Sequence, residues 1–456
     1  MNILIKPTGL IVENIIQNSM GNEAFGTFAA LNSLAFLFIV FLDLGINQFM
    51  IKELASNQEG VHDKLSGYFS LKIVLAILYP IFMIIIGYIL GYSVEKIYWL
   101  FLISLGYCFF QLSMYLRSKF SALQKFNLDS LASISDKFFL IFFSLFLIVT
   151  SVTVLNYISV RLLAVFLTFI ILFIPAWKLF SKKSFVLEWS ISSWLTTLKF
   201  TYPFALITIL YSIHDKVDQV MIERMIGNHA SGLYAASYRW LDAFMMYLWI
   251  ILPMFFSKFS YTKDNIGELN RLLKSAQVIT AIPMIFISIF VWFHGEKLFL
   301  LLTNSSIQEV DEMASCLNVL FIAAFIHAYF AAFGTLLTAI GGEHFLNRMM
   351  LLTIALNIGL NLYMIPEFGI QGAAWATAIC TLFLSVAYVY KLRQLKLYTI
   401  DLTITLKLVL YSMVITSCFY MCSLLHYSWF LSFTLVGIIM AFFVFASGLY
   451  KLLLKL

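Results

Sequence analysis

Apolar residues run through the chain in long segments that short polar stretches separate. Segments of about 20 apolar residues are long enough to cross a bilayer as helices. They fall near residues 3–20, 28–50, 67–90, 97–116, 131–150, 157–177, 199–222, 231–256, 273–294, 314–338, 346–365, 370–390, 404–425 and 428–450. They lack the strict alternation of apolar and polar residues that marks the strands of an outer-membrane barrel. The pattern predicts an all-α polytopic membrane protein with about 14 transmembrane helices.

The first segment is the weakest of these. The sequence MNILIKPTGLIVENIIQNSM is short and carries Lys6, Pro7, Glu13 and Asn14. It has neither the apolar core nor the small-residue cleavage site of a signal peptide. Two explanations are open: the true start lies upstream, or this helix lines a polar interior. We favour a truncated start.

The composition agrees with a membrane protein. Hydrophobic residues make up 62% of the 456 residues and charged residues only 11%, against about 25% charged residues in soluble domains. The five cysteines lie in or beside apolar segments and form no pattern with histidines or carboxylates, so we expect no disulfide, metal site or cofactor. The positive residues are spread over many loops, which argues against a nucleic-acid surface.

The distribution of lysine and arginine predicts the orientation. Cytoplasmic loops carry the excess of positive residues. With both termini inside, most of the 29 lysines and arginines, Lys182 and Lys183 among them, fall in cytoplasmic loops. Outside loops then hold only Lys96, Arg224 and Lys297. The asymmetry supports an even number of spans and two cytoplasmic termini.

Four positive residues remain inside the spans: Lys72, Arg161, Lys216 and Arg239. A charge within the bilayer costs at least about 2.5–3.5 kcal/mol and usually faces a bundle interior or a water-filled cavity. Lys72 and Arg161 lie near span ends, where long side chains reach the interface. Lys216 and Arg239 lie deeper, so we expect them to line a polar cavity that binds an anionic group.

Intramembrane carboxylates accompany these cations. Asp215 and Asp218 lie beside the first of the two deep cations, and Asp242 follows the second by three residues, on one helical face. Local neutralisation of the cations is one explanation, cavity or ion-coupling carboxylates are another, and the two are compatible. Asp43, in FLDLGINQF, is either a cap or lysine partner, or else a cavity carboxylate or proton site.

One short motif occurs twice. Residues 20–30 read MGNEAFGTFAA and residues 226–236 read IGNHASGLYAA, with six of the eleven positions identical. Each copy leads into a span and six spans separate them, so both halves enter the membrane in the same direction. This is a parallel repeat about an axis along the membrane normal, and transporters of this kind bind substrate between their halves. Glycine and alanine permit a tight turn and close helix packing.

The repeat divides the chain into two lobes of six spans. We predict an N-terminal lobe at residues 1–178, a cytoplasmic linker at 179–198, a C-terminal lobe at 199–391 and two additional C-terminal helices within 392–456. A parallel pseudo-two-fold axis is expected to relate the two lobes.

Three stretches resemble a known family. The segment GNEAFGTFAALNSLAFLFIVFLDLGINQFMIKELAS is similar to the N-terminal motif of the polysaccharide-biosynthesis flippases. These are the Wzx-like lipid-linked oligosaccharide transporters of the MATE-related MOP superfamily. The segment HDKVDQVMIERMIGNHASGLYAASYRWLDAF resembles the family's seventh-to-eighth-span region, and LNIGLNLYMIPEFGIQGAAWATAIC its eleventh-to-twelfth-span region. With the span count the resemblance covers nearly the whole chain, but its motifs mark the family and not the substrate.

The resemblance implies that the protein is a flippase and not an enzyme. Such proteins move undecaprenyl-diphosphate-linked oligosaccharides across the bacterial inner membrane by alternating access, for surface polysaccharides such as O-antigen. H+ or Na+ is the candidate coupling ion, and the polysaccharide assembly machinery a candidate partner. Arginine and lysine hold diphosphates through charge-assisted hydrogen bonds, and aromatic rings stack on sugars. Lys216 and Arg239, with Arg161 and Lys72 behind them, are therefore the predicted substrate-binding residues.

Three alternatives stay open. A multidrug exporter of organic cations needs unpaired carboxylates in its cavity, whereas the intramembrane carboxylates here are matched by cations. A lipid II flippase of the same superfamily is a second alternative, and the sequence distinguishes it poorly from an oligosaccharide flippase. A membrane polymerase or ligase for lipid-linked sugars tends to have a large outer loop with catalytic groups. The longest outer loop, at about residues 295–313, is small, and the chain has no nucleophile elbow, metal-ligand cluster or phosphate-binding loop.

Overall fold

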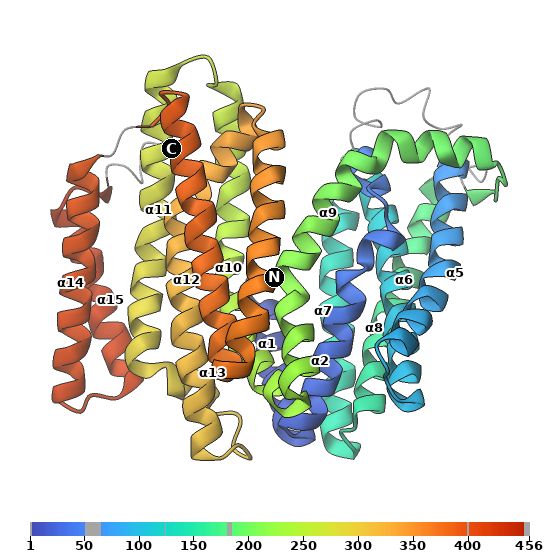
Figure 1. Ribbon diagram of the computed structural model, residues 1–456, viewed down its shortest axis with the longest axis horizontal. Helices are drawn as coiled ribbons and strands as arrows, with labels where there is room; N and C mark the ends of the chain where they lie inside the picture. The colour runs from blue at the N-terminus through green and yellow to red at the C-terminus, as the bar shows by residue number, and fades with distance from the viewer. Residues whose placement is uncertain (1, 51–64, 124, 180–184, 399–400, 451–456) are drawn as a thin grey trace. The chain divides into compact units, whose positions relative to one another are not determined.

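Nearly all of the residues that the structure describes are helical (Figure 1). The computed structural model describes residues 2–50, 65–123, 125–179, 185–398 and 401–450. Lys182 and Lys183 therefore lie outside the described residues. The helices, in chain order, are α1 (Asn2–Met20), α2 (Asn22–Leu37), η1 (Ile39–Leu42), α5 (Leu65–Ile89), α6 (Val94–Ala122), α7 (Phe126–Thr150), α8 (Val154–Leu179), α9 (Ile191–Ile226), α10 (Asn228–Tyr261), α11 (Ile266–His294), η3 (Gly295–Phe299), α12 (Ile307–Ala339), α13 (Glu343–Gln394), α14 (Leu402–Leu424) and α15 (Trp429–Ala446). The described part of the chain contains no strand, and the predicted all-α fold is confirmed.

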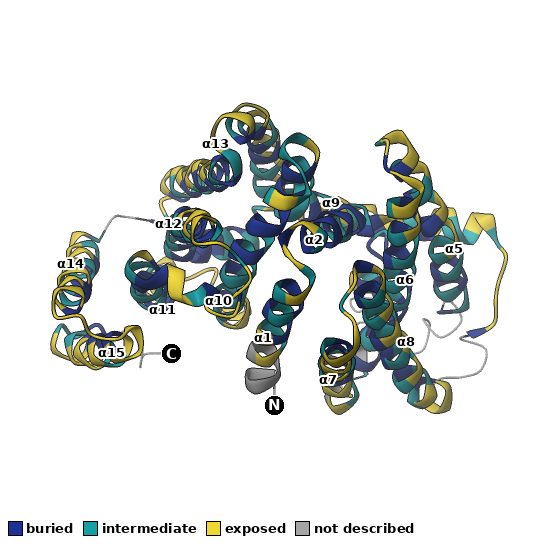
Figure 2. Ribbon diagram, turned by 90° about the horizontal axis from the view of Figure 1, so that it is seen from below, coloured by how far each residue is buried: buried dark blue, intermediate teal, exposed yellow. Residues whose placement is uncertain are grey.

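Ten of the described helices, α5 to α8 and α10 to α15, are long and apolar enough to cross a membrane. Their exposed faces carry large apolar side chains. Figure 2 shows how much of α14 and α15 is exposed. On α15, for example, Phe442 is 72% exposed and Ile438 is 69% exposed. Apolar side chains suit contact with lipid, and the backbone polar groups of a helix need no partner there because they are hydrogen-bonded within the helix. The chain is a multi-pass membrane protein.

The described residues pack as two compact units, Met1–Gly232 and Leu233–Leu456. The predicted lobes divide the chain earlier, in the linker at 179–198. The difference arises because α9 follows that linker and yet packs against α2 and η1 in the first unit. The approach is close: a Cβ at Gly45 would lie 2.5 Å from the backbone oxygen of Thr201 on α9. The predicted lobe boundaries stay a prediction.

The span predicted at 28–50 is interrupted. Helix α2 ends at Leu37, η1 follows, and the chain then turns through Leu44 and Gly45, whose φ angles are 46° and 79°. Positive φ is unstrained for glycine but unfavourable for leucine. The break leaves backbone and side-chain polar groups of this segment facing their neighbours instead of continuing the helical ladder.

Helix α13 contains the two spans predicted at 346–365 and 370–390. Its 52 residues are interrupted by non-helical backbone at Gly369, where φ is 59° and ψ is −141°. Pro366, just before this point, lacks the backbone N–H that would continue the helical ladder. Two antiparallel segments therefore follow one another with almost no loop, in agreement with the two predicted spans.

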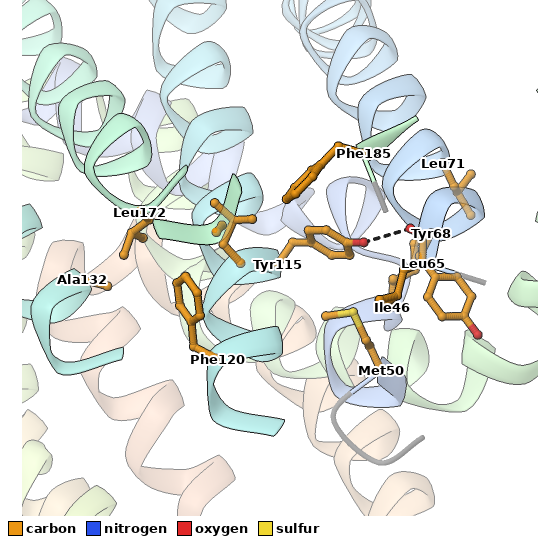
Figure 3. Close-up of a cluster of buried hydrophobic side chains, with 12 residues drawn as sticks. Ile46, Met50, Leu65, Tyr68, Leu71, Tyr115, Phe120, Ala132, Leu172 and Phe185 are labelled. Atoms are coloured by element: carbon orange, nitrogen blue, oxygen red, sulfur yellow. Dashed lines mark hydrogen bonds between the residues drawn. The ribbon is translucent and has the colours of Figure 1, made fainter. Parts of the chain in front are cut away.

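A buried apolar cluster holds one end of the first unit together (Figure 3). Tyr115 of α6 is fully buried, and its hydroxyl donates a hydrogen bond to the backbone oxygen of Leu65 at 3.1 Å. Phe185, from the segment before α9, packs in the same cluster as Phe120 and Leu172. The cluster therefore ties that segment to α5, α6 and α8.

The two copies of the repeated motif form matching one-residue turns. Gly21 is the single residue between α1 and α2, and Gly227 is the single residue between α9 and α10. Their φ angles are 85° and 101°, in the region that favours glycine. The sequence repeat is thus also a repeat of backbone conformation.

These two copies also contact each other within the first unit. A Cβ at Gly26 would lie 1.8 Å from the backbone oxygen of Asn228, and a Cβ at Gly232 would lie 1.9 Å from that of Asn22. Ser231 Oγ donates a hydrogen bond to the Gly26 oxygen at 3.0 Å. The first residues of α10, 228–232, therefore cross α2 backbone to backbone within the first unit, with each copy of the motif placing its glycine on the backbone oxygen of the other copy's asparagine.

A polar clasp, formed by Tyr92, Lys96, Glu223 and Asn228, lies beside this crossing. Glu223 is 7% exposed and accepts hydrogen bonds from Tyr92 Oη at 2.8 Å and from Lys96 Nζ at 3.0 Å. Lys96 also donates to Asn228 Oδ1 at 3.1 Å. The clasp joins the α5–α6 turn to the α9–α10 turn, and by the predicted orientation it lies on the outer side of the membrane.

Candidate functional site

Arg161 is held in place on α8 by a carboxylate and by aromatic rings. Its Nη1 lies 3.2 Å from Glu13 Oε1, on α1, and 3.2 Å from the hydroxyl oxygen of Tyr157, one turn earlier on α8. The guanidinium carbon lies 5.3 Å from the ring centre of Phe28 and 5.6 Å from that of Tyr157. Cations over aromatic faces are attracted by the ring quadrupole. Arg161 is thereby oriented before any ligand arrives.

One edge of this guanidinium is available to a ligand. Arginine has five N–H donors, and both hydrogen bonds of Arg161 use Nη1. Nη2 and Nε form none with the described residues, and the side chain is 32% exposed. A planar pair of donors is the arrangement that binds phosphate oxygens in bidentate fashion.

A cavity of about 200 Å³ lies beside Arg161 and is lined by α2, α6, α7 and α8 of the first unit. Polar and aromatic side chains from all four helices line it, among them Phe28, Asn32, Phe36, Tyr107, Asp136 and Arg161. The helices that form it are neighbours in the fold, since α8 packs on both α6 and α7.

Tyr107, which lines the cavity, lies within electrostatic range of Lys216. Its hydroxyl donates a hydrogen bond to Asn32 Oδ1 at 3.1 Å, and both Arg161 and Lys216 lie close enough to interact with it electrostatically. Two of the four predicted cations, from α8 and α9, are therefore within electrostatic range of one phenol. Lys216 Nζ also lies 3.0 Å from Asp215 Oδ2, the arrangement that the local-neutralisation explanation expects; the cavity role of both residues stays a prediction. Asp218 lies on the same helix and is 5% exposed.

Lys72 is placed differently from the expectation. Its side chain is 1% exposed and its ammonium group donates to Asp43 Oδ1 and, at 3.2 Å, to the backbone oxygen of Leu42. The prediction that Lys72 reaches the interface is wrong, because the break in α2 presents these two oxygen atoms to α5. Asp43 Oδ1 also accepts from the backbone N–H of Asn47 at 3.2 Å, so Asp43 is both a cap and a lysine partner.

Arg239 and Asp242 belong to the second unit. They lie three residues apart on α10, and both side chains are partly exposed. The predicted substrate-binding residues are thus distributed over the two units, with Lys72, Arg161 and Lys216 in the first.

Several side chains around the candidate site are not predicted by the sequence. Glu13 only weakens the first predicted span, although an intramembrane carboxylate is a natural partner for an intramembrane cation. Asn14 and Gln17, also on α1, are fully buried, so this helix does present polar groups to the interior. Asn32 and Tyr107 had no signal, since isolated asparagines and tyrosines are common in spans. Among the described residues, no group of three His, Cys, Asp or Glu side chains is placed to hold a metal ion.

Comparison with known proteins begins at the sequence level. The family model described as polysaccharide biosynthesis protein matches residues 1–256. An uncharacterized membrane protein of Methanocaldococcus jannaschii is 23% identical over 206 residues, which are 45% of this chain and 48% of that protein. The match thus spans about half the length of this curated relative.

Solved structures show a similar fold. Lipid II flippase MurJ in an inward closed conformation superposes with a TM-score of 0.81 at 17% identity, covering 99% of this chain and 98% of that one. An inward-facing multidrug resistance MATE family transporter of the MOP superfamily gives 0.67 at 16% identity, covering 86% and 95%. The chain has the polytopic fold of these transporters. Because the matching family model covers more than half of its residues, the chain belongs to the polysaccharide biosynthesis protein family.

Proposed function

We propose that the protein is a flippase that moves undecaprenyl-diphosphate-linked oligosaccharides from the cytoplasmic to the outer leaflet of a bacterial inner membrane by alternating access. The observation that carries this proposal is the arrangement of Arg161: a guanidinium within a predicted span, paired with Glu13 through Nη1 and lining a cavity. Membership of the polysaccharide biosynthesis family and the fold shared with transporters support it.

The diphosphate is the part of such a substrate that crosses hydrocarbon least readily. Arg161 and Lys216, both within electrostatic range of Tyr107, supply donors to its oxygen atoms in the first unit. Arg239, on α10 of the second unit, stays a predicted substrate-binding residue. Glu13 and Asp215 lower the cost of placing the first two charges in the membrane. They also limit how tightly an anion binds, which suits a site that must release its cargo.

Lys72 has a different role in this proposal. Its ammonium group is enclosed and bonded by Asp43, so it reaches a phosphate only if that pair breaks. We assign the pair to coupling instead: protonation of Asp43 would release Lys72 at the break in α2. We expect a proton gradient to speed transport by the wild-type protein and to have no effect on Asp43→Asn. If a sodium gradient drives transport by both proteins instead, the assignment is contradicted.

The paired carboxylates argue against an exporter of organic cations. Glu13, Asp43 and Asp215 each lie against a positive side chain, and a cationic drug would have to displace that partner. The carboxylates that would attract it are therefore already neutralised.

Transport in proteoliposomes tests the proposal. We would measure leaflet-to-leaflet movement of a labelled polyprenyl-diphosphate oligosaccharide, with lipid II and an organic-cation dye as separate cargoes. Arg161→Gln and Lys216→Gln are expected to slow the oligosaccharide at least 10-fold, and Arg117→Gln is the matched control, since Arg117 pairs with Asp129 and does not line the cavity. Dye export without lipid movement would refute the flippase proposal, and preference for lipid II would reassign its cargo.

A further inference from the structure

The cavity beside Arg161 has features that a phosphate alone does not need. Aromatic side chains form much of its wall, namely Phe28, Phe36, Tyr107 and Phe110. The rings of Phe36 and Tyr107 lie 6.2 Å apart, edge to face. Flat apolar surfaces with a polar rim match the C–H face of a sugar ring, whereas a diphosphate gains nothing from them.

Hydrogen-bonding groups face the same space. Asn32 Oδ1 is occupied by Tyr107, while the amide nitrogen of Asn32 forms no hydrogen bond with the described residues. Asp136 Oδ2 lies 3.9 Å from Lys137 Nζ, which is too long for a hydrogen bond. A ligand in the cavity therefore meets an amide donor on α2 and a carboxylate acceptor on α7. Neighbouring hydroxyl groups, which donate and accept, use both.

Charge and size narrow the choice of ligand. Arg161 is paired with Glu13, and Asp136 lies beside Lys137, so the formal charges of these four side chains cancel. The volume of about 200 Å³ is below the roughly 300–1,000 Å³ of sites for drug-sized molecules. The space suits one ring and not a whole oligosaccharide.

We propose that this cavity is a subsite for a single uncharged sugar ring with neighbouring hydroxyls, next to the phosphate held by Arg161. The inference rests on the proposed function, because it gives the lipid-linked glycan a second point of contact in the first unit. The aromatic rings receive the C–H face of the sugar, and Asn32 and Asp136 receive its hydroxyls. A uronic acid in this position would add a carboxylate to a cavity whose cations Arg161 and Lys137 already have carboxylate neighbours, and burying an uncompensated charge is costly, so the subsite selects against it.

Binding to the purified full chain in nanodiscs tests this assignment. The ligands are polyprenyl diphosphate, the same lipid carrying one hexose, and the same lipid carrying one hexuronic acid. We expect wild-type protein to bind the hexose-bearing lipid about 10-fold more tightly than the bare lipid, which corresponds to roughly 1.4 kcal/mol. The hexuronic acid is expected to give no such gain.

Four variants locate the preference. Asn32→Leu and Phe36→Leu are each expected to reduce the 10-fold preference for the hexose to less than three-fold. Their matched controls are Asn127→Leu and Phe142→Leu, because both residues are exposed on α7 and do not line the cavity. The controls are expected to keep the preference. Thermal unfolding of each variant verifies that it is folded, and using two cavity variants ensures that misfolding of one does not decide the result.

The outcomes separate the two proposals. The sugar subsite would be overturned if wild-type protein bound the bare and hexose-bearing lipids equally tightly. It would also be overturned if the preference for the hexose survived in both cavity variants. In either case the proposed function would stand if Arg161→Gln still weakened binding of the diphosphate. Hexuronic acid binding as tightly as hexose would overturn the selection against charge. If none of the three lipids binds, the proposed function is refuted, and the subsite with it.

Discussion

Gly26 of α2 and the backbone oxygen of Asn228 on α10 are so close that a Cβ on the glycine would lie 1.8 Å away. We therefore expect Gly26→Ala to lower the stability of the protein by at least about 1–3 kcal/mol, the usual cost of overpacking a well-packed site. Gly232→Ala should behave alike, because its Cβ would lie 1.9 Å from the Asn22 oxygen. Thermal unfolding in detergent measures both effects.

Gly359→Ala is the matched control for these two substitutions. Gly359 lies within α13 and a Cβ there meets no atom within 4 Å. Alanine at such a position is expected to be neutral or to stabilise by about 0.4–1 kcal/mol. Equal unfolding temperatures for all three variants would show that the crossing is looser than described.

The buried pair of Lys72 and Asp43 makes a prediction about single and double substitutions. Removing one partner leaves a buried charge uncompensated, so Lys72→Met or Asp43→Leu alone should destabilise by about 3–5 kcal/mol. Replacing both with apolar residues should recover most of that loss. A double-mutant cycle on unfolding free energies measures the coupling, and additive losses would mean that the two groups do not depend on each other.

Because of Tyr92, we expect the free energy of unfolding to fall at alkaline pH. Burial, and then the adjacent Glu223 carboxylate, raise the pKa of this tyrosine, which lies between α5 and α6. A group with a raised pKa holds its proton more tightly in the folded state. Its contribution is complete below the unfolded pKa of about 10 and is lost as pH rises above it. Unfolding temperatures across that range should fall more steeply for wild type than for Tyr92→Phe, and parallel curves would contradict the assignment.

Because of Asp401, we expect the free energy of unfolding to fall at acidic pH. Its carboxylate accepts hydrogen bonds from the backbone N–H groups of Thr403 at 3.0 Å and Ile404 at 3.2 Å, capping α14. The hydrogen bond from Lys274, followed by these backbone bonds, lowers the pKa of Asp401. The stabilisation is therefore present above the ordinary aspartate pKa of about 3.9 and is lost as pH falls below it.

Two substitutions separate the cap from the ion pair at this position. Asp401→Ala should cost about 0.5–2 kcal/mol at neutral pH, whereas Asp401→Asn should keep the cap and lose only the contact with Lys274. Unfolding at neutral pH and near pH 3 measures both effects. Unfolding temperatures of Asp401→Asn as low as those of Asp401→Ala would assign the stabilisation to the charge alone.

Much of the fold was predictable from the apolar segments, but its details were not. Segment length fixes where helices cross the bilayer, and Gly369 with Pro366 marks the tight turn inside α13. Hydropathy does not show that α9 packs with the first unit, because that depends on contacts such as the one between Gly45 and Thr201. Tertiary contacts place α9 in the first unit, and its hydropathy pattern would be the same if it belonged to the second unit.

The candidate site was predictable in its charges and not in its geometry. Lys216 with Asp215 was read from adjacent residues, since neighbours in sequence must be neighbours in space. Arg161 with Glu13 joins α8 to α1, and spacing along the chain contains no information about such a pair. Lys72 was misplaced for the same reason: its partner is presented by the break in α2.

The crossing of α2 with residues 228–232 at the start of α10 has the form of a two-fold symmetric interface. In such an interface one surface patch packs against a second copy of itself, so each contact occurs twice with the partners exchanged. Gly26 against Asn228 and Gly232 against Asn22 are such a pair of contacts, although both copies here belong to one chain. A glycine lost from either copy has to be accommodated by the asparagine of the other. A substitution in one copy of the motif is therefore felt by the other copy, so the two copies constrain each other although about 200 residues separate them in the sequence.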